Sequence, residues 1–189
     1  VWNMLNTKYL IVPVKDQAPK AIPNPEALGN AWFVKQYRLV ANADSEIVAL
    51  DKFKAADEAI VDKRFENEIK NIKIIPDSNA YIKLSSYHPM KLTYEAKAAS
   101  EQLAVFSEIY YDKGWNAYLD GKLVPHIRAN YILRAMKIPA GEHKIEFKFE
   151  PTSYAIGNKI SLASSISLIL LSLGIIVWEI IGQKKEETL

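Results

Sequence analysis

The hydrophobic pattern of the chain changes once, from short alternating runs over most of its length to one long apolar run near the C-terminus. That run covers residues 160–181 and contains a single charged residue, Glu179. At a helical rise of about 1.5 Å per residue it reaches roughly 33 Å, which matches a hydrocarbon core of about 30 Å. We therefore predict a transmembrane helix over residues 158–182, followed by a short polar tail over 183–189.

A polar stripe runs along one face of this predicted helix, at about 100° per residue. Its members are Ser161, Ser165, Ser172 and Glu179. In lipid, small and hydroxylated side chains gather where helices approach closely, and an intramembrane acid usually faces protein or water. The stripe favours packing against other membrane helices. The alternative is that serine is simply tolerated in lipid and that Glu179 extends to the headgroups.

The region before the long run consists of short β-branched and aromatic runs bounded by turn residues, a pattern typical of strands. The expected strands cover residues 9–12, 31–40, 72–75, 81–85, 91–96, 103–110, 115–119, 122–124, 131–138 and 143–150. In the last of these, Ile145, Phe147 and Phe149 alternate with charged residues, which predicts one buried and one exposed face. Asp120-Gly121 predicts a tight hairpin turn, because both residue types tolerate positive φ. The regular spacing predicts a mainly β fold, a β-sandwich or jelly-roll-like domain with one short helix, followed by the single transmembrane helix.

The short helix is expected to be capped by Asp44 or Ser45 and to continue to about Lys54, with Ile47, Leu50 and Phe53 on one face. Residues 19–29 are expected to form a loop. We predict one β-rich domain over 1–157, with a strand-plus-helix subregion at 31–68 and the sandwich core at 69–151.

The orientation in the membrane is predicted from the basic residues that flank the long run. Lys184 and Lys185 follow it closely and Lys159 precedes it, so the tail is expected in the cytoplasm of a bacterial cell and residues 1–157 outside it. The first residues offer neither a signal peptide nor a membrane segment that would export this domain. We therefore expect the chain to be the C-terminal part of a longer protein, although a processed N-terminus would explain the start equally well.

Composition removes several classes of function. The formal net charge of +2 gives no broad field for nucleic acid, and the absence of cysteine excludes disulfides, thiolate nucleophiles and cysteine-based zinc sites. His88, His126 and His143 lie far apart and match no metal-ligand spacing. No phosphate-binding glycine loop or nucleophile elbow is present. We predict no metal site, no cofactor and no catalytic residue in this chain.

One aromatic and polar stretch offers a candidate binding site. Residues 110–121, together with Arg128 and Asn130, combine rings that can stack on sugars with side chains that can bind hydroxyl groups. The candidate glycan-binding residues are Trp115, Tyr118, Asp120, Arg128 and Asn130. The alternative is that the aromatic residues cover the sandwich core and that the glycines shape turns.

The same stretch carries a family resemblance. LNTKYLI at 5–11, YYDKGWNAYLDG at 110–121, RANY at 128–131, IPAGEH at 138–143 and FKFEP at 147–151 precede the last membrane helix. In this combination the chain resembles the C-terminal end of YfhO-like bacterial membrane proteins. The resemblance implies a multi-pass protein of GT-C-type glycosyltransferase architecture that transfers sugars from lipid-linked donors to envelope polymers.

The resemblance also limits what is expected of this chain. In GT-C enzymes the catalytic acid lies in an early extracytoplasmic loop, which has no counterpart here. We therefore expect an accessory module that positions a glycan or acceptor, with membrane lipid, other transmembrane helices and an envelope glycan or lipid-linked sugar as partners. The alternative is a structural or assembly module with no ligand site.

Overall fold

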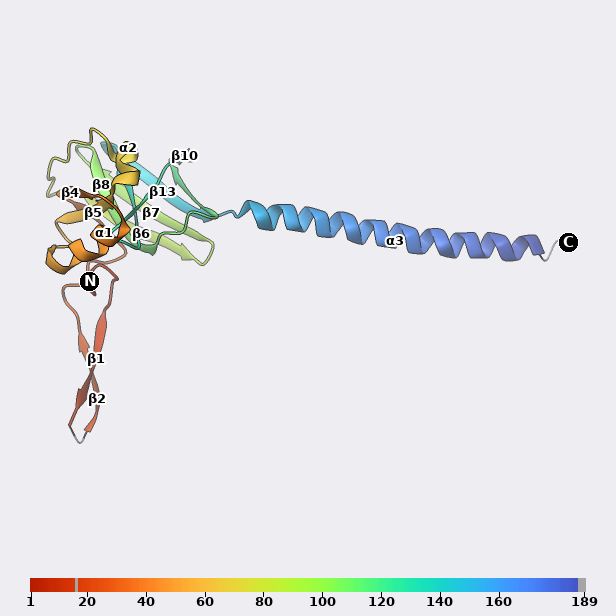
Figure 1. Ribbon diagram of the computed structural model, residues 1–189, viewed down its shortest axis with the longest axis horizontal. Helices are drawn as coiled ribbons and strands as arrows, with labels where there is room; N and C mark the ends of the chain where they lie inside the picture. The colour runs from red at the N-terminus through yellow and green to blue at the C-terminus, as the bar shows by residue number, and fades with distance from the viewer. Residues whose placement is uncertain (16, 187–189) are drawn as a thin grey trace. The chain divides into compact units, whose positions relative to one another are not determined.

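The chain forms two compact units, Val1–Phe149 and Glu150–Leu189. The computed structural model describes the backbone of residues 1–15 and 17–186 and the side chains of residues 1–15 and 17–178. Strands dominate the first unit, and the second contains one long helix, α3, Thr152–Glu186 (Figure 1). The prediction of a mainly β fold with one C-terminal apolar helix is confirmed.

The larger sheet of the first unit has five antiparallel strands in the order β10-β9-β13-β7-β6. Their bounds are β6 Tyr81–His88, β7 Lys91–Ala98, β9 Trp115–Leu119, β10 Lys122–Val124 and β13 Gly141–Phe149. The alternation predicted for β13 is present, since Ile145 and Phe147 are fully buried whereas Lys144 and Lys148 contact a carboxylate on the other face.

A second sheet has four strands in the order β11-β12-β8-β3. Their bounds are β3 Ala31–Val34, β8 Gln102–Ile109, β11 Ile127–Ala129 and β12 Leu133–Ile138. Between the two sheets, Tyr94, Phe106 and Phe147 pack edge to face with ring centroids 4.9 to 6.2 Å apart. This contact forms the sandwich core.

The four-stranded sheet is buried on both faces. Its outer face packs on a second core that includes Ala59, Val61 and Ile69. These residues belong to a layer of β4 Gln36–Val40 and β5 Glu58–Asp62, which pair in parallel, with α1 Ala43–Ala49, the 3-10 helices Leu50–Lys52 and Lys63–Phe65, and α2 Glu66–Ile69. Double-sided burial explains why β8 is apolar at consecutive positions rather than alternating.

The expected strand over 31–40 is two strands in different sheets. The chain turns at Lys35, where the backbone N–H groups of Lys35 and Gln36 both donate to the carbonyl oxygen of Asp57. Lys35 also forms an ion pair with the Asp57 carboxylate at 2.6 Å. This contact redirects the chain from β3 in the four-stranded sheet to β4, so the prediction of one long strand was wrong.

Two further expectations need correction. Residues 72–75 form no strand; Ile72 is buried in the second core, and the Ile75 carbonyl accepts from the Gln102 side chain instead of from a neighbouring strand. The first part of the expected loop at 19–29 belongs to a strand, β2 Gln17–Pro23, which tolerates its prolines because it is an edge strand.

Helix α1 is shifted from its predicted position. Asn42 caps it by accepting from the N–H of Ser45 at 2.9 Å, in place of Asp44 or Ser45. Leu50 and Phe53 pack against the second core as expected, but Ile47 is 47% exposed and Glu46 faces the interior. Glu46 faces the interior because its carboxylate pairs there with Arg128.

The predicted turn at Asp120-Gly121 is confirmed. Leu119 pairs directly with Lys122, and Asp120 and Gly121 have φ of 50° and 81°. Two consecutive positive φ angles match the right-handed twist of the flanking strands in a two-residue hairpin.

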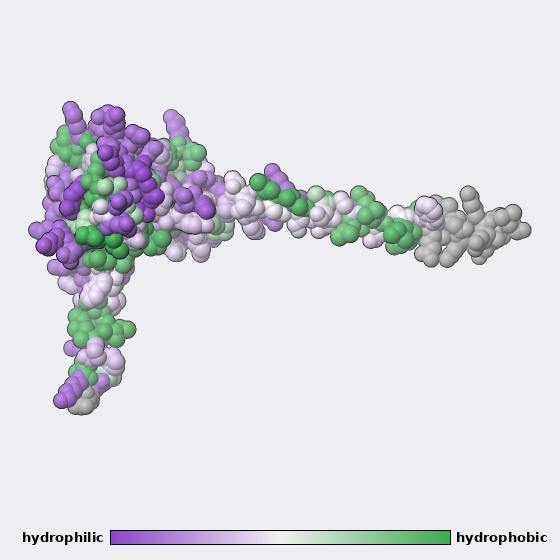
Figure 2. Space-filling view, viewed as in Figure 1, coloured by the Kyte–Doolittle hydropathy of each residue, from purple (hydrophilic) through white to green (hydrophobic). Residues whose placement is uncertain are grey.

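A separate antiparallel hairpin precedes the sandwich. It consists of β1 Tyr9–Val14 and β2 Gln17–Pro23, and it projects away from the two larger sheets (Figure 1). Its side chains are almost all exposed, and Figure 2 shows apolar residues along it.

Helix α3 is the one helix among the described residues that is long and apolar enough to cross a membrane, over Thr152–Trp178. It begins at Thr152, before the membrane segment predicted over residues 158–182.

Candidate functional site

The five residues predicted to bind glycan come from two different sheets. Trp115 and Tyr118 lie on β9 and Asp120 directly follows it, whereas Arg128 lies on β11 and Asn130 follows that strand. On β9, Trp115 shares the inner face with fully buried Ala117, so Tyr118 points to the outer face. The structure does not bring the five side chains together on one surface.

Trp115 is half-buried and packs on a buried cation. The guanidinium of Arg134 lies 4.2 Å from the Trp115 ring centroid and 5.1 Å from that of Phe147. Arg134 is 2% exposed, and its Nε donates to the Ile109 carbonyl at 3.0 Å. Burial lowers the pKa of Arg134. Arg134 lies outside the set of residues predicted to bind glycan, and its cation–π contact gives Trp115 a packing role.

Other polar groups lie around this cation. Among the described residues, Tyr94 Oη, His126 Nε2 and Arg134 Nη1 are buried without a hydrogen-bond partner. Burial lowers the pKa of His126 to about 4, with a further contribution from Arg134, and raises the pKa of Glu108. The arrangement favours an uncharged imidazole near neutral pH beside a permanent positive charge.

The outer face of the five-stranded sheet carries a lysine-ringed carboxylate. Glu146 contacts Lys91, Lys144 and Lys148 at 2.7, 3.3 and 3.6 Å, and these contacts lower its pKa to about 2. Lys148 Nζ lies 4.4 Å from the ring centroid of Tyr118. Tyr118 therefore belongs to a charged surface, apart from Trp115.

Asp120 closes the end of the β9–β10 hairpin. Its carboxylate lies 2.7 Å from His143 Nδ1 and accepts from the backbone N–H of Lys144 at 2.8 Å, and these contacts lower its pKa. It borders a surface hollow of about 420 Å³ that also includes His143, Lys144 and Tyr81.

Arg128 is held in a buried ion pair. Its Nη2 lies 2.6 Å from Oε2 of fully buried Glu46, whose Oε1 accepts from the backbone N–H of Tyr131 at 2.8 Å. Asp62 Oδ2 lies 3.6 Å from the same guanidinium. These contacts tie β11 to α1 and β5, and sequence spacing gave no signal for Glu46 as the partner.

Asn130 bonds to the backbone of Ile60 through both its own N–H and its side-chain oxygen. Its N–H donates to the carbonyl of Ile60 and its Oδ1 accepts from the N–H of Ile60, both at 2.8 Å. Asn130 and Tyr131 have φ of 50° and 72°, in the left-handed region. The RANY motif thus forms a strained turn held by buried bonds.

Two serines of the predicted stripe bond to their own helix. Ser165 and Ser172 donate to the carbonyls of Ser161 and Leu168, each at 2.9 Å. The hydroxyls are therefore satisfied either in lipid or against another helix, and both readings of the stripe stay open. The side chain of Glu179 lies outside the described residues, as do residues 187–189 of the tail predicted over 183–189.

No three His, Cys, Asp or Glu side chains come close enough to hold a metal ion in the part of the chain that the structure describes.

A β-sandwich that continues into one long apolar helix defines a class of membrane protein with a globular β domain. The family described as Bacterial membrane protein YfhO matches residues 4–161. The chain belongs to this family, as the motifs predicted. No curated protein and no solved structure matches it.

Proposed function

We propose that this chain is the extracytoplasmic assembly module and a membrane anchor of an envelope glycosyltransferase that uses lipid-linked sugar donors. Its role is to pack against the membrane-embedded body of that protein, and catalysis takes place elsewhere. The observation that carries this proposal is the exposed apolar hairpin of β1 and β2.

The hairpin is apolar on both faces. Ile22 pairs with Leu10 and lies on the same face as Val12, whereas Tyr9 and Ile11 lie on the other face. Ile11 is 76% exposed and Tyr9 65%. An isolated two-stranded hairpin is at best marginally stable in water and usually needs a third surface. Exposed apolar side chains on both faces fit a hairpin that other parts of a larger protein cover from both sides.

The contacts of the predicted glycan residues also support an assembly role. Arg128 and Asn130 are used by buried internal bonds, and Trp115 packs on Arg134. A glycan-positioning role has weaker support, because Tyr118 and Asp120 alone face the open side of the five-stranded sheet.

Site-specific photo-crosslinking in the whole membrane protein tests the proposal. A benzophenone amino acid at Ile11 should crosslink within the protein, whereas the same residue at Val48 should not. Val48 is a matched control because it is 74% exposed, close to the value for Ile11, but lies on α1. Equal yields at the two positions would overturn the assembly role.

A further inference from the structure

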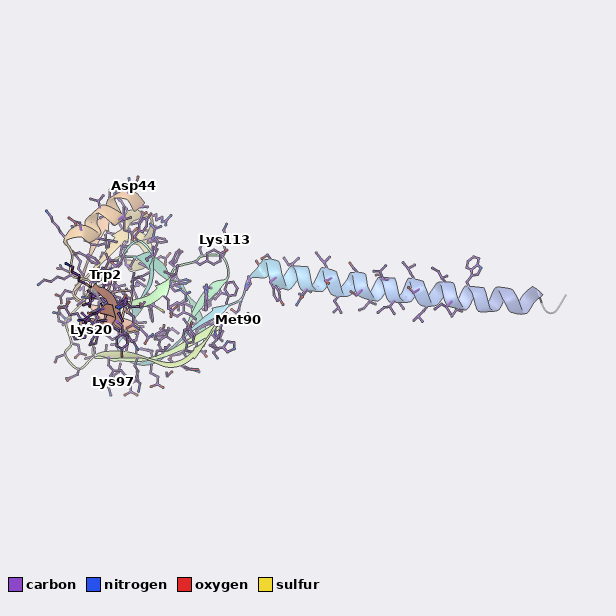
Figure 3. The ribbon with its side chains drawn as sticks, turned by 90° about the horizontal axis from the view of Figure 1, so that it is seen from below. Trp2, Lys20, Asp44, Met90, Lys97 and Lys113 are labelled. Carbon is purple, nitrogen blue, oxygen red and sulfur yellow. The ribbon has the colours of Figure 1, made fainter. Side chains whose placement is uncertain are left out.

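One end of the sandwich, where β13 ends, presents exposed apolar and aromatic side chains. We call it the loop end and define it by Met90, Ile109, Tyr111 and Lys113. Met90 lies in the β6–β7 turn, and the other three lie at the end of β8 and in the β8–β9 loop. Met90, Ile109 and Tyr111 are 50%, 58% and 49% exposed. Met90 and Lys113 lie at the same end of the β-rich unit, far from Lys97 (Figure 3).

The covalent chain ties the loop end to the membrane helix. Phe149, the last residue of β13, donates its N–H to the Met90 carbonyl at 2.9 Å and pairs with Trp115. Only Glu150 and Pro151 separate Phe149 from Thr152, where α3 begins. At no more than about 3.6 Å per residue, this connection spans at most roughly 11 Å.

The length of α3 sets the level of this connection relative to a bilayer. Among the described residues, the helix that is long and apolar enough to cross a membrane covers Thr152–Trp178, and its uninterrupted apolar run begins at Ile160. When that run crosses the hydrocarbon core, Thr152 lies about 12 Å before it along the helix, at about 1.5 Å per residue. Thr152 then lies near the outer edge of the headgroup layer, and the loop end cannot lie far from it.

From these observations we propose that the loop end docks on the lipid bilayer, with Met90 and Tyr111 inserted among the headgroups. Tyrosine suits this layer because its ring is apolar and its hydroxyl is polar. Lys113 adds attraction to anionic lipids, which Asp112 beside it offsets, so apolar insertion dominates the contact. This docking rests on α3 crossing the bilayer and not on the hairpin contact, so either proposal can fail alone.

Single-cysteine labelling tests the docking without background, because the chain has no cysteine. Met90→Cys and Lys97→Cys, each in the full chain, carry an environment-sensitive fluorophore in lipid nanodiscs, where both membrane faces are open to solvent. We expect a blue-shifted emission and several-fold weaker iodide quenching at position 90 than at position 97. A headgroup-attached quencher should act on position 90 alone. Equal iodide quenching at the two positions would overturn the proposal.

A second variant identifies the anchoring side chain. Tyr111→Asp should raise iodide quenching of the label at position 90 toward the value at position 97. Tyr81→Asp is the matched control, since Tyr81 is 44% exposed and pairs with Lys97 at the other end of the sheet. Circular dichroism checks that both variants fold. Folded Tyr111→Asp protein with unchanged quenching would refute the role of Tyr111 in docking.

Discussion

The sandwich and the β1–β2 hairpin are both antiparallel β structure, but they place the same residue types in opposite environments. Phe106 and Ile145 in the sandwich are fully buried, whereas Ile11 in the hairpin is 76% exposed. The difference is the presence of a facing layer: each sandwich sheet has one, and no element of the described first unit covers the hairpin. The sandwich is therefore built to be stable by itself, and the hairpin to be completed by contact.

The largest effect should come from breaking the network that ties the sandwich to α1. Arg128→Ala leaves fully buried Glu46 without its cation and should cost about 3–5 kcal/mol of unfolding free energy. Urea unfolding of the full chain in detergent measures it.

The matched control is Lys97→Ala, which breaks an exposed ion pair with Glu142. It should leave the unfolding midpoint nearly unchanged, because solvent screens such pairs. If both variants shift the midpoint equally, the buried network does not stabilise the sandwich.

The next effect compares the sandwich and the hairpin directly. Trp115→Ala should lower the unfolding free energy by about 3 kcal/mol, the low end for a large aromatic residue, because Trp115 is only half-buried. Ile11→Ala should change it by no more than about 0.5 kcal/mol, as expected of exposed positions.

Titration with envelope glycans completes this comparison. An unchanged unfolding midpoint for Trp115→Ala, together with lost glycan binding, would contradict the packing role and favour a sugar site at Trp115. A large destabilising effect of Ile11→Ala would contradict the division between a self-sufficient sandwich and a dependent hairpin.

Local chemistry explains which parts of the fold the sequence predicts correctly. The alternation of Ile145 and Phe147 with lysines and the Asp120-Gly121 turn depend on neighbouring residues only, and both are as predicted. The break at Lys35 depends on the Asp57 carbonyl, a distant partner. Residues 72–75 have the composition of a strand, but the Gln102 side chain bonds to the Ile75 carbonyl.

The same distinction applies to the candidate site. Arg128 and Glu46 meet although they are 82 positions apart, and nothing in the spacing of either residue indicates the pair. Trp115 and Arg134 meet across the two sheets of the sandwich, so their contact depends on how the sheets face each other. Sequence pattern therefore indicated which segments matter, but not whether their side chains bind a ligand or each other.

The smallest of the three predicted losses of sandwich stability depends on pH. His126 packs against Tyr110 and Phe147 in the sandwich, where burial lowers its pKa from 6.5 to about 4. The unfolded chain takes up this proton first as pH falls, so stability is lost between pH 6.5 and pH 4. From pH 7 to pH 5 the loss should be about 2 kcal/mol.

The raised pKa of Glu108 makes stability rise as pH falls, which opposes the effect of His126. The quantity to measure is therefore the difference in unfolding free energy between the native chain and His126→Phe at each pH. Parallel pH profiles for the two would show that His126 is not buried as a neutral group.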